Sequence, residues 1–103
     1  MKLDNLAFYK YSFSFLNVYL PDQKGRSPNT VDTYSSSFTV LNRFLAGEKQ
    51  ISVLAFKFSD CTPDFVMEFL DWLKSEGNKE ATRNIRLTCI KGYLEYAARK
   101  DVS

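Results

Sequence analysis

The stretch EGNKEATRNIRLTCIKGYLEYAARKD, from Glu76 to Asp101, contains a helix stop, a helix start and a long amphipathic segment. Glycine commonly ends a helix, so Gly77 is expected to end the one before it. A new helix is predicted from about Lys79 to Arg99. Its apolar residues fill one broad arc: Ile85, Cys89, Ile90, Tyr93, Leu94, Tyr96 and Ala97. The stretch therefore predicts a helix that packs on a core with this arc and presents cations and amides elsewhere.

Three upstream segments show the same helical spacing of apolar residues. The first runs from about Asp4 to Leu20, and Pro21 is expected to end it because proline lacks an N–H donor. The second begins at Ser27-Pro28 and the third at Thr62-Pro63, each with a hydroxyl N-cap followed by a proline in the first turn. Gly47 is expected to close the second helix. We predict an all-α fold, with residues 1–103 forming a single small domain.

The first predicted helix is apolar around much of its circumference. One line of residues is expected to face the core: Leu6, Tyr9, Phe13, Leu16 and Leu20. A second line, Phe8, Phe15 and Tyr19, lies about 120° around the helix. Because a small domain buries both lines only with difficulty, the second line is a candidate contact surface for another protein, the alternative being core and surface aromatics. The apolar segment Ile51–Phe58 is expected to be a connector that lies on the bundle.

The net charge of +2 hides an uneven distribution. Residues 1–58 carry seven cations and four anions (+3), residues 59–76 one cation and five anions (−4), and residues 77–103 six cations and three anions (+3). The acidic part coincides with the third helix, whose outer face carries Asp64, Glu68, Asp71 and Glu76. Nucleic acid would repel that face, so the second and fourth helices are the candidates for contact with a negatively charged partner.

The composition argues against catalysis, cofactors and membranes. The chain has no histidine, the usual general base near neutral pH, and nothing pairs its carboxylates, lysines or tyrosines for chemistry. Cys61 and Cys89 are too few for a metal site or a disulfide framework and are expected to be reduced thiols. No apolar run is long enough to span a membrane, and no secretory signal is recognisable. We expect a cytoplasmic protein without cofactor, metal or small-molecule substrate.

Both candidate helices, the second and the fourth, begin with residues suited to nucleic acid. Short hydroxyl side chains let a helix approach a phosphate backbone, and a helix N-terminus adds its own donors. Arginine and asparagine make two-pronged contacts with guanine and adenine. The candidate DNA-binding residues are Arg26, Ser27, Asn29, Thr30, Thr33, Arg43, Lys79, Thr82, Arg83, Asn84, Arg86, Lys91 and Arg99. Their spacing is equally compatible with base reading, phosphate contact or a solvated polar face.

The order of three motifs extends this interpretation: YLPDQKGRSPNTVDTY from Tyr19 to Tyr34, FLDWL from Phe69 to Leu73, and EGNKEATRNIRL with IKGYLEYAA after it. Together they resemble the N-terminal core-binding (SAM-like) domain of tyrosine recombinases, the phage integrase superfamily, and most nearly the transposon-type integrases. The likeness covers about residues 6–100. It implies a compact orthogonal bundle of four to five short helices that forms half of a C-shaped clamp on duplex DNA, with the second and fourth helices at the major groove.

The resemblance also implies what the chain lacks. In this family the chemistry belongs to a separate C-terminal domain with arginine, lysine, histidine and a nucleophilic tyrosine, and a chain without histidine departs from that pattern. We therefore expect a non-catalytic, excised domain whose partners are duplex DNA and other recombinase protomers, with the second aromatic line as a protomer contact. Phosphate contacts would come mostly from Arg26, Lys79, Lys91, Arg99 and Lys100. The alternative is a helical protein-interaction module that docks through its aromatic first helix.

Overall fold

The computed structural model describes residues 3–101, and over this range the fold is all-α, as predicted. An N-terminal helix of residues 8–23 combines η2 (Phe8–Tyr11), α1 (Ser12–Ser14) and η3 (Phe15–Gln23). It is followed by α2 (Pro28–Phe44) with its extension η4 (Leu45–Lys49), then α3 (Pro63–Ser75) and α4 (Glu80–Asp101). Two short 3-10 turns, η1 (Leu3–Asn5) and η5 (Phe58–Asp60), complete the order of elements.

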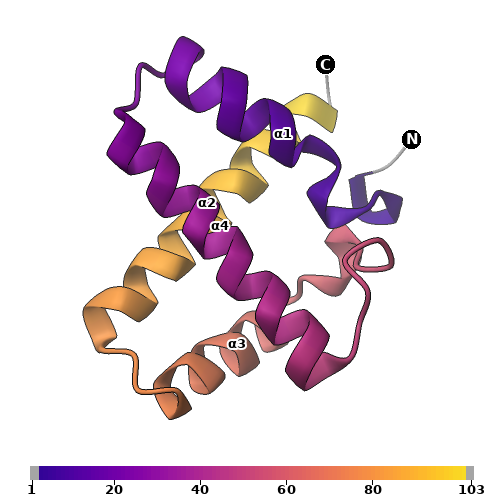
Figure 1. The fold of residues 1–103 in the computed structure, drawn as a ribbon. Coiled ribbons are helices and arrows are strands. Elements are labelled where there is room, and N and C mark those ends of the chain that lie inside the picture. Colours follow the sequence, from indigo (N-terminus) through magenta and orange to yellow (C-terminus); the bar gives the residue numbers. More distant parts are fainter. Residues whose placement is uncertain (1–2, 102–103) are drawn as a thin grey trace.

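The helices form two layers, in which α2 crosses α4 near the middle of both (Figure 1). The Cα atoms extend over 37 × 32 × 19 Å, and the shortest dimension matches two packed helices. The N-terminal helix packs beside α2 at one end of the crossing, and α3 lies at the other end (Figure 1). In the part of the chain that the structure describes, no helix has the length and apolar character to cross a membrane.

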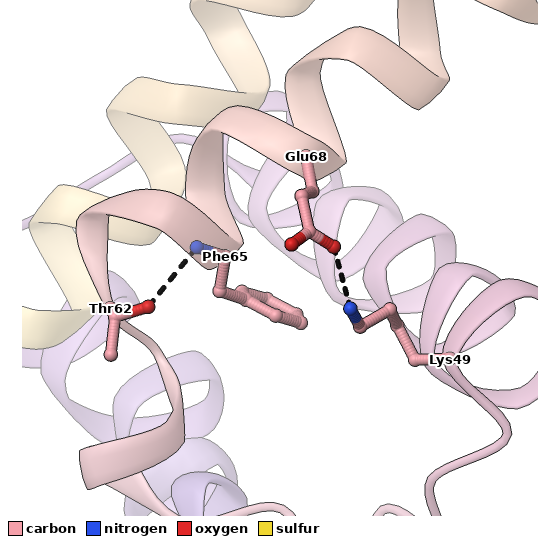
Figure 2. A network of polar contacts seen from close by, with 4 residues as sticks. All are labelled: Lys49, Thr62, Phe65 and Glu68. Carbon is pink, nitrogen blue, oxygen red and sulfur yellow. Dashed lines mark hydrogen bonds and ion pairs between the residues drawn. The ribbon is translucent and has the colours of Figure 1, made fainter.

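The predicted helix starts are confirmed at Ser27 and Thr62. The Ser27 hydroxyl oxygen accepts from the Thr30 N–H at 3.3 Å, and the Thr62 hydroxyl oxygen accepts from the Phe65 N–H at 3.1 Å. Figure 2 shows the second of these caps beside an ion pair of 2.5 Å between Lys49 and Glu68, which links η4 to α3. Local hydrogen bonding thus sets where both helices begin.

The predicted stop after α3 is also confirmed. Gly77 adopts a φ of 90°, a left-handed conformation that favours glycine. The Asn78 N–H donates to the Leu73 carbonyl at 3.0 Å, and the Gly77 N–H donates to the Lys74 carbonyl at 3.0 Å. These bonds complete the end of α3 and turn the chain into α4.

The core is built around Tyr93, a fully buried residue of α4. Its ring centroid lies 5.1 Å from those of Phe8 and Phe38, and 5.3 Å from that of Phe15. Its hydroxyl donates to the Phe8 carbonyl at 2.5 Å and accepts from the Tyr11 N–H at 3.2 Å. One side chain therefore joins the last helix to the first.

The predicted contact surface on the N-terminal helix is wrong for Phe8 and Phe15, which are 0% and 1% exposed and belong to the core. Tyr19 is half-buried and stacks on Phe15 with ring centroids 5.7 Å apart. Phe13, expected in the core, is 75% exposed. The cause is the backbone: the helix starts with 3-10 geometry and continues with i→i+5 π geometry, so steps of 100° per residue assign its faces incorrectly.

Two predicted helix ends are also wrong. Pro21 lies inside η3, where the Lys24 N–H bonds the Tyr19 carbonyl five residues back, a wider turn that accommodates the proline ring. Gly47 lies inside η4, and the chain turns out of this helix at Gln50, with φ 53°. The proline and glycine signals in the sequence placed both helix ends too early, because the last turns of both helices have π geometry.

The connector of residues 51–58 divides into an exposed and a buried part. Val53 and Leu54 are 37% and 86% exposed, contrary to the prediction, whereas Phe56 and Phe58 are buried as predicted. The Phe8 N–H donates to the Phe56 carbonyl at 2.8 Å, and the Phe58 N–H donates to the Leu6 carbonyl at 3.0 Å. This short backbone pairing brings both phenylalanines into the core beneath the N-terminal helix.

Candidate nucleic-acid interface

A groove of about 320 Å³ lies between the first half of α2 and the first half of α4. The structure brings three predicted residues together in it, Thr33 from α2 and Thr82 and Arg86 from α4. It also adds Asp32, Ser36 and Ile85, which were not among the predicted site residues. Asp32 and Ser36 are four residues apart on one helix face, and that spacing could have identified them.

Ile85 was expected in the core and is instead 45% exposed at the edge of this groove. The apolar arc of α4 begins with Cys89 and Ile90, both 2% exposed. No residue of α4 before Cys89 is buried, so an apolar residue in these first turns meets the groove and solvent.

Arg86 is fixed at the floor of the groove. Its Nη1 donates to the Ser37 hydroxyl at 3.0 Å, and Ser37, 3% exposed, donates in turn to the Thr33 carbonyl at 2.9 Å. The Nε of Arg86 is buried, and no acceptor in residues 3–101 takes its hydrogen. A guanidinium held in this way is pre-oriented, and its Nη2 group remains able to donate to a ligand in the groove.

A buried thiol lies next to this arginine. Burial raises the pKa of Cys89, while its hydrogen bond with Ser37 and the nearby Arg86 charge act in the opposite direction. The neutral thiol therefore completes the polar floor between α2 and α4 without adding a charge.

Arg83 faces a different neighbour. Its Nη1 donates to the Asn78 carbonyl at 2.6 Å, so it supports the turn between α3 and α4 and is absent from the groove lining. Arg83 and Arg86 are three residues apart, but they are anchored to different elements. A DNA contact by Arg83 stays a prediction. Its hydrogen bond to the Asn78 carbonyl indicates a structural role.

The other predicted residues surround the groove or lie elsewhere. Asn29 and Ser27 are exposed at the start of α2, and the Thr33 hydroxyl donates to the Asn29 carbonyl at 2.9 Å. Arg43, at the far end of α2, lies with its guanidinium carbon 5.8 Å from the centre of the Trp72 ring. Four further predicted residues are exposed, lie in or just before α4, and do not line the groove: Lys79, Asn84, Lys91 and Lys100.

Arg26 and Arg99 lie together in a second recess, lined also by Tyr34 of α2 and Gly92 of α4. Two of the predicted phosphate-contacting residues are therefore neighbours in space, although 73 positions separate them in the sequence. Lys24, which also lines this recess, was not predicted. It follows Tyr19 by five residues in a π-type turn, so regular helical spacing gave no signal for it.

None of the four acidic residues predicted for the outer face of α3 lines the groove. Asp64, Glu68, Asp71 and Glu76 are all exposed, as predicted. Glu68 and Asp71 border a recess together with Glu48 and Lys49, which follow the C-terminal end of α2, whereas the groove is lined by residues from the first half of α2. Opposite ends of α2 therefore present different charge to solvent.

The comparisons with known proteins agree with this fold. Residues 8–103 match the family model described as the phage integrase SAM-like domain. Over 86 residues the chain is 30% identical to y4rC of Sinorhizobium fredii (strain NBRC 101917 / NGR234), whose name describes it as an integrase/recombinase. That match covers 82% of this chain and 26% of the relative, so the chain spans about a quarter of the relative's length. No solved structure gives a significant match. Because the family model covers most of the chain, this protein belongs to the phage integrase SAM-like domain family.

Proposed function

We propose that residues 1–103 form the core-binding domain of a site-specific tyrosine recombinase, and that this domain holds duplex DNA while other parts of the enzyme cut and rejoin the strands. Family membership and the helical fold support the proposal. The observation that carries it is the groove between α2 and α4, lined by hydroxyl groups above an anchored arginine.

The residues of the groove suit base edges better than phosphates. The major groove of DNA, about 12 Å wide, admits an α-helix. Arginine donates to guanine, and an exposed apolar side chain such as Ile85 contacts a thymine methyl group. Asp32 would repel a phosphate but accepts readily from the cytosine amino group. We therefore place the first turns of α2 and α4 in the major groove.

The separation of DNA binding from strand cleavage is inferred from the small part of the relative that this chain matches. The y4rC relative extends well beyond the region that this chain matches, and its name describes an integrase/recombinase. We assign strand cleavage to such an additional region and DNA positioning to the present domain. The conclusion for this chain is a binding role with no covalent step of its own.

Fluorescence anisotropy with a mixed-sequence duplex at increasing salt tests the proposal. If about five phosphates are neutralised, log affinity falls against log salt with a slope of about −4 to −5, and binding is micromolar or weaker. Thr82→Glu places a carboxylate in the groove at a helix start that tolerates it, and we expect binding at least tenfold weaker. Ser59→Glu, on the exposed turn η5, is the matched control. Equal binding by the two variants, or no binding of the unmodified chain at low salt, would refute the proposal.

Substitution of Arg83 or Arg86 by alanine is a less direct test. Each change removes an internal hydrogen bond as well as a positive charge. The free energy of unfolding of each variant therefore has to be measured beside its affinity for DNA. The Thr82→Glu variant avoids this complication because no side-chain hydrogen bond of Thr82 is present among the described residues.

We also propose that the N-terminal helix contacts a second recombinase protomer, now through its exposed side. Phe13 and Val18 are 75% and 41% exposed and lie five residues apart in a helix whose other aromatics are packed. Exposed apolar residues mark protein contacts where they form a contiguous patch, and the proposal is that Phe13 and Val18 form one. Light scattering on the chain with a duplex carrying two binding sites tests it. We expect a two-protomer complex that Phe13→Ser abolishes, and an unchanged mass would refute this contact.

A further inference from the structure

A second polar recess, of about 200 Å³, lies on a different side of α2 from the groove. The two sides are distinguished by successive residues, since Thr33 lines the groove and Tyr34 lines the recess, about 100° further around α2. On α4, the groove uses the first turns and the recess uses Gly92, Glu95 and Arg99. α2 thus forms a ridge between the two depressions.

Three cations converge on this recess. The Lys24 ammonium lies 6.0 Å and the Arg99 guanidinium 5.6 Å from the centre of the same Tyr19 ring. Arg26 follows Lys24 by two residues and is close enough to Tyr34 to act on its phenol: burial raises the pKa of Tyr34, and the Arg26 charge opposes this. With Glu95 as the one carboxylate in the lining, three positive charges and one negative charge leave the recess at +2.

These charges are not neutralised internally. Among the side chains that the structure describes, none of the three cations is within ion-pairing distance of a carboxylate, Glu95 included. Elsewhere in the described chain, Lys49 pairs with Glu68. The recess therefore keeps positive charge that an external anion can meet.

The recess is rich in donors as well as in charge. Arg99 donates to the Tyr19 hydroxyl, so the Tyr19 proton points away from that bond and is free to donate. The Tyr34 hydroxyl has no acceptor among the described residues. Its position depends on Gly92, where a Cβ atom would come within 2.9 Å of the Tyr34 oxygen. Two phenols, two guanidinium groups and an ammonium group thus face a space with one acceptor side chain.

We propose that this recess binds a phosphate group, held by Lys24, Arg26 and Arg99 and by the Tyr34 hydroxyl. Guanidinium groups and phenols are charge-assisted donors of the kind that tetrahedral oxyanions accept from. In the complex with DNA, which rests on the function proposed above, the phosphate belongs to the backbone of one strand. The ridge of α2 then lies in the major groove, and the recess binds a backbone phosphate of the strand at the edge of that groove.

The test compares two variants with an equal reduction in charge. Lys24→Gln/Arg26→Gln removes two exposed cations of the recess, and Lys10→Gln/Lys74→Gln removes two exposed cations elsewhere. If the recess variant neutralises one phosphate fewer, the slope of log affinity against log salt falls by about 0.9, which is about eightfold weaker binding at 0.1 M salt. We expect this change in the recess variant and less than a twofold change in the control.

A titration with inorganic phosphate, followed through the amide NMR signals of Gly25 and Gly92, separates this inference from the proposed function. If the unmodified chain binds duplex DNA and both variants bind equally, the phosphate site is refuted and the DNA-binding function stands. If the unmodified chain fails to bind DNA, the function is refuted. Phosphate-dependent shifts that the recess variant lacks would then support the site, and their absence would refute it.

Discussion

Replacing Tyr93 by phenylalanine is the substitution that most directly tests how the bundle is held together. The ring would keep its packing against Phe8, Phe15 and Phe38, because phenylalanine has the same shape without the hydroxyl. Only the oxygen is removed, and with it the bond to the Phe8 carbonyl and the bond from the Tyr11 N–H. The change therefore isolates two hydrogen bonds from the hydrophobic contribution.

The size of the effect follows from what is left behind. A buried polar group without a partner costs about 1–3 kcal/mol. The Phe8 carbonyl is in a fully buried environment, whereas the Tyr11 N–H is only partly buried and regains some hydration. We expect Tyr93→Phe to lower the free energy of unfolding by about 2–4 kcal/mol, which corresponds to a fall in Tm of about 10–20 °C for a domain of this size.

Urea unfolding followed by circular dichroism measures this change, with an unchanged m-value showing that the folded state has kept its compactness. Tyr96→Phe is the matched control, since among the described residues the Tyr96 hydroxyl bonds only the Ser14 hydroxyl, at 2.9 Å, and Ser14 keeps a second bond to the Tyr11 carbonyl. We expect a cost of about 1 kcal/mol or less there. Equal costs for the two variants would refute the view that Tyr93 joins the last helix to the first.

Three further changes have expected outcomes, each checked by urea unfolding. Thr62→Ala removes the N-cap of α3 and should lower the free energy of unfolding by about 1 kcal/mol, while Thr62→Ser retains it; equal reductions would exclude the cap as the cause. Gly77→Ala should cost more than about 1 kcal/mol because φ is 90°, whereas Gly47→Ala, in open space within a helical turn, should be neutral or stabilising; the reverse order would contradict the assigned helix ends. Burial raises the pKa of the Cys61 thiol from 9.0 to about 11, so the unfolded chain loses this proton first and stability falls as pH rises from 9 to 11. The contribution is about 2–3 kcal/mol, and a Cys61→Ala variant with an equally steep fall would show that other groups cause it.

The sequence predicted those parts of the fold that depend on local signals. Serine or threonine followed by proline marked the starts of α2 and α3, because the side-chain cap and the missing proline donor act within one turn. Gly77 marked the end of α3 for the same local reason. The N-terminal helix was predicted as an element but with its faces misassigned, because it changes from 3-10 to π geometry, whereas the prediction assumed a regular 100° per residue.

The candidate site was predicted in part, since residue type suggested the chemistry but did not identify neighbours. Thr33, Thr82 and Arg86 do meet in the groove, whereas Arg83 turns to the Asn78 carbonyl. Arg26 and Arg99 were chosen separately as cations, and only the crossing of α2 over α4 makes them one cluster with Lys24. Contacts between residues far apart in the sequence depend on the crossing of whole helices, and one sequence contains no direct record of it.

The Tyr93 hydroxyl reaches the backbone at Phe8 and Tyr11, positions 85 and 82 residues earlier in the chain. On the ribosome, the segment that carries Phe8 and Phe15 would therefore wait for nearly the whole domain to be synthesised before its aromatic side chains find their partners. Such distant contacts slow folding, and the waiting segment exposes a surface that promotes aggregation. Expression at lower temperature, or with a chaperone that covers apolar segments, should raise the soluble yield of this domain more than that of a bundle closed by local contacts.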